Sequence, residues 1–268
     1  MEREQNQYNY TNRTMKNNIR YILLLLALVG FAFSGPTPKR QIFLVGDSTM
    51  SEKRVTAYPE TGWGMMFSKF IDTSNTVIYN HAQNGRSTKS FVEENRWAPI
   101  VDKLQPGDLV LIQFGHNDEV PTKPQATTQK QFQINLAKYI RDTKAKKAIP
   151  VLITPAARRS FDAEGNLQDT HQVYSALVRK VAKKEGVTLV ELDKKSQAVL
   201  ESFGPENSKW LFNHLKPGQH PNYPEGKVDD THFSELGARK MAEIVYKELN
   251  SQNPGGIAVH FFKPVPKK

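Results

Sequence analysis

The 268-residue sequence predicts an α/β protein, a three-layer α/β/α sandwich with a five-stranded parallel sheet at its centre. Short apolar runs alternate with longer amphipathic stretches along most of the chain, which is typical of repeated strand–helix units. The apolar runs, such as residues 108–114, are nearly continuous in hydrophobic character. Strands of this kind are expected where helices cover both faces of a parallel sheet.

The hydrophobic pattern places each element in turn. Apolar runs predict strands at 41–46, 76–81, 108–114, 149–154 and 187–192. Amphipathic spacing predicts helices at 61–72, 128–147, 169–185, 193–203 and 234–250. The stretch 204–231 has no clear periodicity and is rich in Pro, Gly, Asn and His, so we expect a long functional loop there.

The N-terminus has the pattern of a secretory signal peptide, which we place at residues 1–34. Basic residues precede an apolar run at 21–33, and the small residues Ala32 and Ser34 at its end offer a cleavage region. The run is shorter than the roughly 20 residues of a membrane span, so we expect cleavage and no stable membrane insertion afterwards. Met15 is an alternative start. The protein is therefore expected to be secreted or periplasmic.

The composition limits the remaining possibilities. The chain is 38% hydrophobic and 24% charged, which suits one sizeable globular domain. We place this domain at residues 35–251 and an irregular extension, rich in Pro and Gly, at 252–268. The sequence has no cysteine, which excludes disulfides, thiol catalysis, Cys-based metal sites and a lipid anchor on cysteine.

The net charge is +10, and residues 1–34 carry four basic and two acidic residues, which leaves about +8 on the remainder. This charge is compatible with an acidic polymer as partner and equally with a solvated lysine-rich surface. We expect no nucleic-acid binding, because the lysines are spread along the chain and no recognition motif is present.

Ser48 follows the first predicted strand, in the sequence Gly46-Asp47-Ser48-Thr49-Met50. We expect it to open a helix, whose N-terminus would favour a bound negative charge, although Ser is also a common helix cap. Far downstream, Asp229 lies three residues before His232, so one tight turn can bring its carboxylate to the imidazole. Serine, histidine and carboxylate together form a nucleophile, its base and the group that orients the base. Asp230 is a rival for the last role.

Two further loop residues are candidates for an oxyanion hole. Gly85 can bring its backbone N–H close to a ligand, and Asn117 can donate from its amide, beside the N–H of Ser48. Ser48, Gly85 and Asn117 follow the first three predicted strands. Because ligands of open parallel sheets bind outside the carboxyl ends of the strands, we expect the three residues to converge on one edge.

Other polar residues suggest substrate contacts rather than a metal. Arg158 and Arg159 follow the fourth strand and could meet a carboxylate. His220 and Tyr223 in the long loop suit a sugar surface. The remaining histidines match no zinc spacing, so we expect no metal; they are His81, His116, His171 and His214.

These motifs together resemble the SGNH (GDSL-like) hydrolase superfamily, over about residues 40–250. The four signature residues of that superfamily correspond to Ser48, Gly85, Asn117 and His232, and its acid, three residues before the histidine, corresponds to Asp229. The resemblance implies the flavodoxin-like SGNH hydrolase fold and an acyl-enzyme mechanism on Ser48, Asp229 and His232. It implies no cofactor.

The rhamnogalacturonan acetylesterase branch is the most similar part of that superfamily. Thr49 stands where the lipase-type pattern has leucine, and further stretches agree with the esterase branch, namely Gly62-Trp63-Gly64, Thr154-Pro155 and residues 215–224. The resemblance implies removal of acetyl groups from a plant cell-wall polysaccharide, and acetylated rhamnogalacturonan, a pectin backbone, is the leading candidate. We expect the protein to be a monomer. Acetylated xylan, a sialic acid ester and a lipid ester are alternative substrates, and a non-catalytic glycan-binding protein is the alternative without chemistry.

Overall fold

The computed structural model describes residues 39–253, 256 and 261–262 of the chain. The signal peptide predicted at residues 1–34 lies outside the described residues, as does most of the extension predicted at 252–268.

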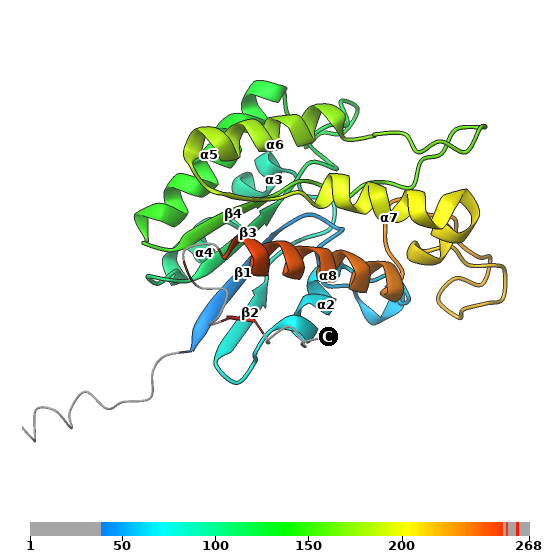
Figure 1. Ribbon diagram of the computed structural model, residues 1–268, viewed down its shortest axis with the longest axis horizontal. Coiled ribbons are helices and arrows are strands. Elements are labelled where there is room, and N and C mark those ends of the chain that lie inside the picture. The colour runs from blue at the N-terminus through cyan, green and yellow to red at the C-terminus, as the bar shows by residue number, and fades with distance from the viewer. Residues whose placement is uncertain (1–38, 254–255, 257–260, 263–268) are drawn as a thin grey trace, which may run out of the picture. The chain divides into compact units, whose positions relative to one another are not determined.

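Five parallel strands form a single sheet with the order β2-β1-β3-β4-β5 (Figure 1). The strands are β1 (Arg40–Gly46), β2 (Thr76–Asn80), β3 (Leu109–Gln113), β4 (Ile149–Ile153) and β5 (Thr188–Val190). Each predicted strand is confirmed in place. From β1 the chain first adds β2 on one side, and then adds β3, β4 and β5 in order on the other side. In open parallel sheets the ligand site lies where the strand order switches in this way, here between β1 and β3.

The helices follow the predicted alternation, with two additions. They are α2 (Trp63–Phe67), α3 (Thr88–Glu93), α4 (Ala98–Lys103), α5 (Gln129–Ala145), α6 (Gln172–Glu185), α7 (Leu192–Asn207) and α8 (Glu235–Gln252), with short 3-10 turns η1 (Val55–Ala57), η2 (Ser68–Phe70) and η3 (Ser208–Leu211). The hydrophobic pattern did not predict α3 and α4, because six residues are too few to show a helical period. The helix predicted at 61–72 is α2 followed directly by η2.

The alternation of side chains along the strands divides the core into two layers, one on each face of the sheet. Ile42 and Leu44 pack with residues of α2, α7 and α8. Phe43 and Val45 pack on the other face with residues of α3, α4, α5 and α6. Figure 1 shows α5 and α6 on one side of the sheet and α2 and α8 on the other. The predicted three-layer sandwich is thus confirmed.

Two aromatic residues near the C-terminus belong to this core. Phe261 and Phe262 are buried, and Phe262 forms a β-bridge with Ile71. The N–H of Asp72 donates to the carbonyl of Phe261 (3.0 Å), and the guanidinium of Arg40 lies 5.6 Å from the Phe261 ring centre. The region predicted as an irregular extension therefore contributes to packing. Within the described residues, no helix is both long and apolar enough to span a membrane.

Candidate active site

Ser48 lies directly after β1 in a tight turn at residues 47–51 and does not open a helix, so this prediction is wrong. The reason is that the carbonyl oxygens a helix would use accept hydrogen bonds from groups outside a helical turn. Lys53 Nζ donates to the carbonyl of Ser48 (2.6 Å). The N–H of Trp63 donates to the carbonyl of Thr49 (2.9 Å), and the N–H of Gly64 to that of Met50 (3.1 Å).

A buried hydrogen-bond network fixes this turn from below. Asp47 Oδ1 accepts from the N–H (3.0 Å) and the hydroxyl (2.8 Å) of Thr49. The Thr49 hydroxyl accepts from Gln113 Nε2 (2.7 Å), and Gln113 Oε1 accepts from Trp63 Nε1 (2.6 Å). Threonine at position 49 thus links β1, β3 and α2, which a leucine could not do. Burial raises the pKa of Asp47, although the hydrogen bonds from Thr49 oppose this.

Ser48, His232 and Asp229 form a continuous hydrogen-bonded chain. His232 Nε2 lies 2.9 Å from Ser48 Oγ, and His232 Nδ1 lies 2.9 Å from Asp229 Oδ2. The other carboxylate oxygen, Asp229 Oδ1, accepts from the backbone N–H groups of Thr231 and His232, both at 2.9 Å. The predicted three-residue spacing therefore produces a turn in which one aspartate holds both the backbone and the ring of the histidine.

The carboxylate of Asp229 is held in its ionised form. Burial by itself would raise the pKa of Asp229, but the hydrogen bonds from the imidazole and backbone N–H of His232 outweigh it. The pKa of Asp229 is therefore held well below its usual range. A carboxylate that stays charged favours the Nδ1–H tautomer of His232, which leaves Nε2 free to accept a proton from Ser48.

Asp230, the rival orienter, takes part in a different network. Its Oδ1 accepts from His214 Nε2 and from Arg159 Nη1, both at 2.8 Å. The geometry therefore gives Asp229 and not Asp230 to His232.

Gly85 and Asn117 lie in the loops after β2 and β3, on the same cavity as Ser48. Gly85 has φ +75°, and a side chain built on it would meet nothing within 4 Å, so its backbone conformation rather than lack of space favours glycine. Asn117 is 4% exposed, and its Nδ2 donates to the carbonyl of Arg86 (3.0 Å). Among the described residues this is the one hydrogen bond of Nδ2, so its second hydrogen is available to a ligand.

The cavity has a volume of ≈ 470 Å³ and is lined mainly by polar and charged side chains. Besides the triad, the lining includes three cations and one acid, Glu60, which is paired with Lys53 (2.7 Å). The lining residues are Ser48, Glu60, Asn84, Gly85, His116, Asn117, Lys123, Arg158, Lys227, Asp229, Thr231 and His232. The structure thus brings all five predicted catalytic and oxyanion-hole residues together at the carboxyl ends of the strands.

Comparison with known proteins agrees with this geometry. Residues 44–240 match the model of the GDSL-like Lipase/Acylhydrolase family. The chain belongs to this family. The family resemblance inferred from the motifs is thereby confirmed.

Relatives of this GDSL-like protein include named polysaccharide esterases. The chain is 42% identical over 207 residues to the rhamnogalacturonan acetylesterase RhgT of Bacillus subtilis, covering 76% of this chain and 87% of that one. It is 25% identical over 244 residues to a rhamnogalacturonan acetylesterase of Emericella nidulans, covering 84% and 90%. The crystal structure of YxiM from Bacillus subtilis superposes with a TM-score of 0.70 at 28% identity; the match covers 82% of this chain and 59% of that chain.

The two arginines predicted to bind substrate have different surroundings in this GDSL-like protein. Arg158 lines the cavity, where its guanidinium donates to the Thr231 hydroxyl (2.5 Å) and to the carbonyl of His116 (3.2 Å). Arg159 does not line it. Its guanidinium binds Asp230, the Ser208 hydroxyl (3.1 Å) and the carbonyl of Pro205, so it joins loops together, and its contact with substrate stays a prediction.

His220 and Tyr223 also lie outside the cavity lining, so their contact with substrate stays a prediction. They form an isolated β-bridge with each other. Tyr223 Oη donates to the carbonyl of Ala57 (2.9 Å), and the His220 ring lies 5.4 Å from that of Tyr58. Tyr223 thus supports the segment around η1, while His220 Nδ1 accepts from the N–H of Asn222 in its own loop (3.1 Å).

Several charged residues of the site were not predicted from the sequence. Lys53 is the most buried of them, with a side chain 2% exposed. Its ammonium contacts the carbonyl of Ser48, Asn84 Oδ1 (2.8 Å) and Glu60 Oε1 (2.7 Å). Lys53 therefore joins the turn that carries Ser48 to the loop that carries Gly85. Burial lowers the pKa of Lys53, and Glu60 opposes this. Among 37 Lys and Arg residues, no local pattern distinguishes Lys53, Lys123 or Lys227.

A pair of buried histidines includes one residue of the cavity wall, His116. The rings of His116 and His171 are 4.4 Å apart at 74°, and His171 Nδ1 lies 2.9 Å from the carboxylate of Glu119. Burial, reinforced by His171 and Arg158, holds the pKa of His116 well below its usual range, so His116 is neutral. Among the described residues, no three His, Asp or Glu side chains are grouped so that they could hold a metal ion.

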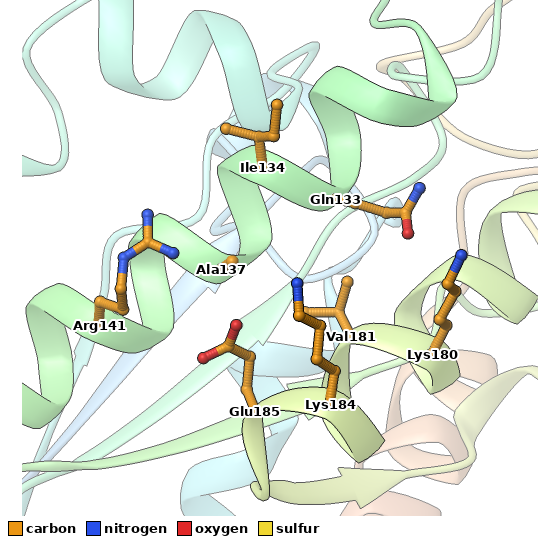
Figure 2. A pocket seen from close by; sticks show the side chains of 8 residues that line it. All are labelled: Gln133, Ile134, Ala137, Arg141, Lys180, Val181, Lys184 and Glu185. Carbon is orange, nitrogen blue, oxygen red and sulfur yellow. The ribbon is translucent and has the colours of Figure 1, made fainter.

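A second cavity of ≈ 250 Å³ lies between α5 and α6 (Figure 2). Its walls are Gln133, Ile134, Ala137, Arg141, Lys180, Val181, Lys184 and Glu185. It shares no residue with the cavity of the triad and contains neither a serine nor a histidine, so it offers no comparable chemistry.

Proposed function

We propose that this protein is a carbohydrate O-acetylesterase that removes acetyl groups from rhamnogalacturonan, with Ser48 as the nucleophile. The observation that carries the proposal is the chain Ser48–His232–Asp229, with 2.9 Å at each link, opening into a polar cavity. The 42% identity to the Bacillus subtilis rhamnogalacturonan acetylesterase RhgT supports the choice of substrate.

The first half-reaction forms an acetyl-enzyme. Ser48 Oγ attacks the acetyl carbonyl carbon while His232 Nε2 takes the hydroxyl proton. The resulting oxyanion accepts hydrogen bonds from the N–H groups of Ser48 and Gly85 and from Asn117 Nδ2. The bond between the acetyl carbon and the sugar oxygen then breaks, and His232 gives its proton to that oxygen, so the sugar leaves as a neutral hydroxyl.

The second half-reaction releases acetate. A water molecule replaces the sugar, His232 takes one of its protons, and the resulting hydroxide attacks the acetyl-enzyme. The same three donors hold the second oxyanion. When the bond to Ser48 breaks, His232 returns the proton to Ser48 Oγ, and Asp229 remains ionised throughout to stabilise the imidazolium. The complete reaction consumes one acetyl ester and one water molecule, releases the sugar hydroxyl and acetic acid, and needs no cofactor.

The chemistry of the cavity favours an acidic sugar chain over a lipid. A long acyl group needs a broad apolar wall, whereas Lys123, Arg158 and Lys227 line this cavity. Galacturonate units of rhamnogalacturonan carry carboxylates that such cations attract. An acetyl group is small enough to need no acyl groove.

We also propose that residues 1–34 direct export and are removed, and that the mature protein is a monomer. The basic residues followed by the apolar run at 21–33 support export. N-terminal sequencing of the extracellular or periplasmic protein tests the cleavage, and light scattering after size-exclusion chromatography tests the monomer. An exported protein that retains the apolar run at 21–33, or a stable dimer, contradicts the respective proposal.

The test of the activity is acetate release by the purified protein from acetylated rhamnogalacturonan, acetylated xylan and a long-chain ester, beside Ser48→Ala. We expect release from rhamnogalacturonan at a kcat/KM well above the other two, and none in the variant. Equal release from both polysaccharides contradicts the choice of pectin and leaves the esterase. Glycan binding without Ser48-dependent release from any substrate contradicts the esterase and favours a binding protein.

A further inference from the structure

We propose that Lys123 is a positioning residue of the oxyanion hole, which orients and polarises the amide of Asn117. The inference rests on the proposed function, because it concerns the same site. Lys123 lies six residues after Asn117, in the loop that connects β3 to α5, and lines the cavity of the triad. None of its neighbours in sequence belongs to a family motif identified above.

The central observation is the contact between the two side chains. Lys123 Nζ lies 2.8 Å from Asn117 Oδ1. An ammonium can only donate, so it requires the oxygen end of the amide to face it. At the other end, Asn117 Nδ2 donates to the carbonyl of Arg86, which can only accept. These two contacts exclude the flipped amide, which would present an acceptor where the oxyanion needs a donor.

The loop of residues 119–127 also contacts the loop that carries Gly85, the other predicted oxyanion-hole residue from a loop. Gln125 lies two residues after Lys123, and its Nε2 donates to the carbonyl of Gly85 (3.1 Å). One segment therefore contacts both Asn117 and Gly85, which come from different loops. Its effect is to fix the distance between two donors that must act on one oxygen.

Tertiary contacts hold this segment at both ends. The carboxylate of Glu119 lies 2.9 Å from His171 Nδ1. The N–H of Thr127 donates to the carbonyl of Asp118 (3.0 Å), and Tyr174 Oη donates to the carbonyl of Thr127 (2.6 Å). Between these ends, the N–H of Lys123 donates to the carbonyl of Val120 (3.0 Å). Lys123 therefore reaches Asn117 from a fixed support.

The charge of Lys123 adds to its positional effect. A cation at the amide oxygen draws electron density from the amide, and its N–H groups become better donors. Asn117 is only 4% exposed, so water screens this interaction weakly. The benefit is largest when the substrate carbonyl becomes an oxyanion, so Lys123 should affect the transition state more than substrate binding.

Another role for Lys123 has different consequences. As a cation of the cavity wall, Lys123 could instead bind a carboxylate of the polysaccharide. That role would raise KM for an acidic substrate when the lysine is lost and would leave a small neutral ester unaffected. The positioning role lowers kcat for both substrates and depends on Asn117.

The experiment is a double-mutant cycle on Lys123→Met and Asn117→Ala, with 4-nitrophenyl acetate as a neutral substrate. We expect Lys123→Met to lower kcat about 10- to 100-fold and to leave KM within about twofold. Complete removal of an oxyanion donor typically lowers kcat about 10²–10³-fold, so the loss of a residue that only positions the donor should be equal or smaller. In the Asn117→Ala background, Lys123→Met should change kcat by less than about twofold, because its target is gone. Lys123→Arg, which keeps a cationic donor, should recover part of kcat.

Lys130→Met is the matched control, because it removes the same charge from an exposed position at the start of α5. It should leave kcat unchanged. The inference is overturned if Lys123→Met keeps wild-type kcat on the neutral ester, or if its loss is undiminished without Asn117. Melting temperatures of all variants detect simple unfolding, and Gln125→Leu provides a second substitution with the same expected split between kcat and KM. Wild-type protein that is inactive on rhamnogalacturonan but cleaves the small ester refutes the proposed substrate and leaves this inference intact.

Discussion

Asp229 and Asp230 are neighbours in the chain, yet their carboxylates belong to separate networks. Asp229 binds the ring and backbone N–H of His232, whereas Asp230 binds His214 and Arg159. One of the two residues therefore orients the candidate base, and the other joins surrounding loops.

This separation predicts that Asp229→Asn is far more damaging to activity than Asp230→Asn. Loss of the charged partner of a catalytic histidine can lower kcat by up to about 10⁴, because the wrong tautomer is favoured. Asp230→Asn keeps an oxygen that can accept from Arg159, so kcat should stay within a few-fold and the main effect should be a lower melting temperature. Steady-state kinetics of both variants decide this, and the reverse order of the two losses would show that Asp230 is the acid.

Ser48→Ala and His232→Ala should each abolish turnover without loss of the fold. Neither side chain is part of the apolar core. We expect kcat to fall by about 10⁴ or more in each variant, and by no further factor in the double variant, because the two residues act as one unit. Acetate release is the measurement, with circular dichroism as the control for folding. Activity near wild type in either single variant refutes the triad.

Thr49→Val should destabilise the turn that carries Ser48. Valine has the shape of threonine but leaves Asp47 and Gln113, both buried, without the linking hydroxyl. An unsatisfied buried partner costs about 1–3 kcal/mol, so the free energy of unfolding in urea should fall by this amount. Thr49→Ser keeps the hydroxyl and is the control. Equal stability of the valine and serine variants would show that the network contributes nothing.

Gly85→Ala should reduce activity more than stability. Its φ of +75° disfavours a side chain, although space for one exists, so we expect a loss of roughly 1 kcal/mol in stability. A shift of the Gly85 N–H should also lower kcat. Gly107→Ala introduces the same type of strain, at φ +87° with open space, in the turn before β3. It should destabilise the protein similarly and leave kcat unchanged; equal kcat losses in both variants would contradict a special role for Gly85.

Asp118 should make stability fall as the pH rises between about 4 and 7. Burial raises the pKa of Asp118 to about 7, although hydrogen bonds from Thr88 and Thr127 oppose it. In this range the unfolded chain is ionised while the folded protein keeps the proton, so the folded state binds more protons and loses stability with increasing pH. Below about pH 4 both states are protonated, and above about pH 7 the loss is complete.

The measurement is the melting temperature from pH 4 to pH 8 for the wild type and Asp118→Asn. Subtracting the wild-type curve from that of the variant removes the effect of the other titrating groups. The melting temperature of the variant relative to the wild type should rise with pH up to about pH 7. Parallel curves would show that Asp118 has an ordinary pKa in the folded protein.

Local patterns were sufficient to predict the strands and the long helices. β3 is a continuous apolar run, and α5 has apolar residues at helical spacing. Both patterns are local, so they can be recognised without knowledge of the tertiary contacts. Patterns failed where the element was short or where long-range contacts replaced local ones. α3 and α4 have six residues each, and in the turn at Ser48 the carbonyls of Thr49 and Met50 accept from the N–H groups of Trp63 and Gly64 rather than from a helical turn.

By itself, the sequence predicted the sheet, the alternation of layers and, through its motifs, the residues Ser48, Gly85, Asn117 and His232 of the candidate catalytic set. It left Asp229 and Asp230 as rivals for the acid, and the tertiary contacts of His232 decided between them. Only the tertiary structure decided which charged side chains join that set. Arg159 and Tyr223 turn to neighbouring loops, while Lys53, Lys123 and Lys227 reach the site. The physical reason is that the direction of a loop side chain is set by the hydrogen-bond partners that folding brings near it, and those partners are distant in sequence.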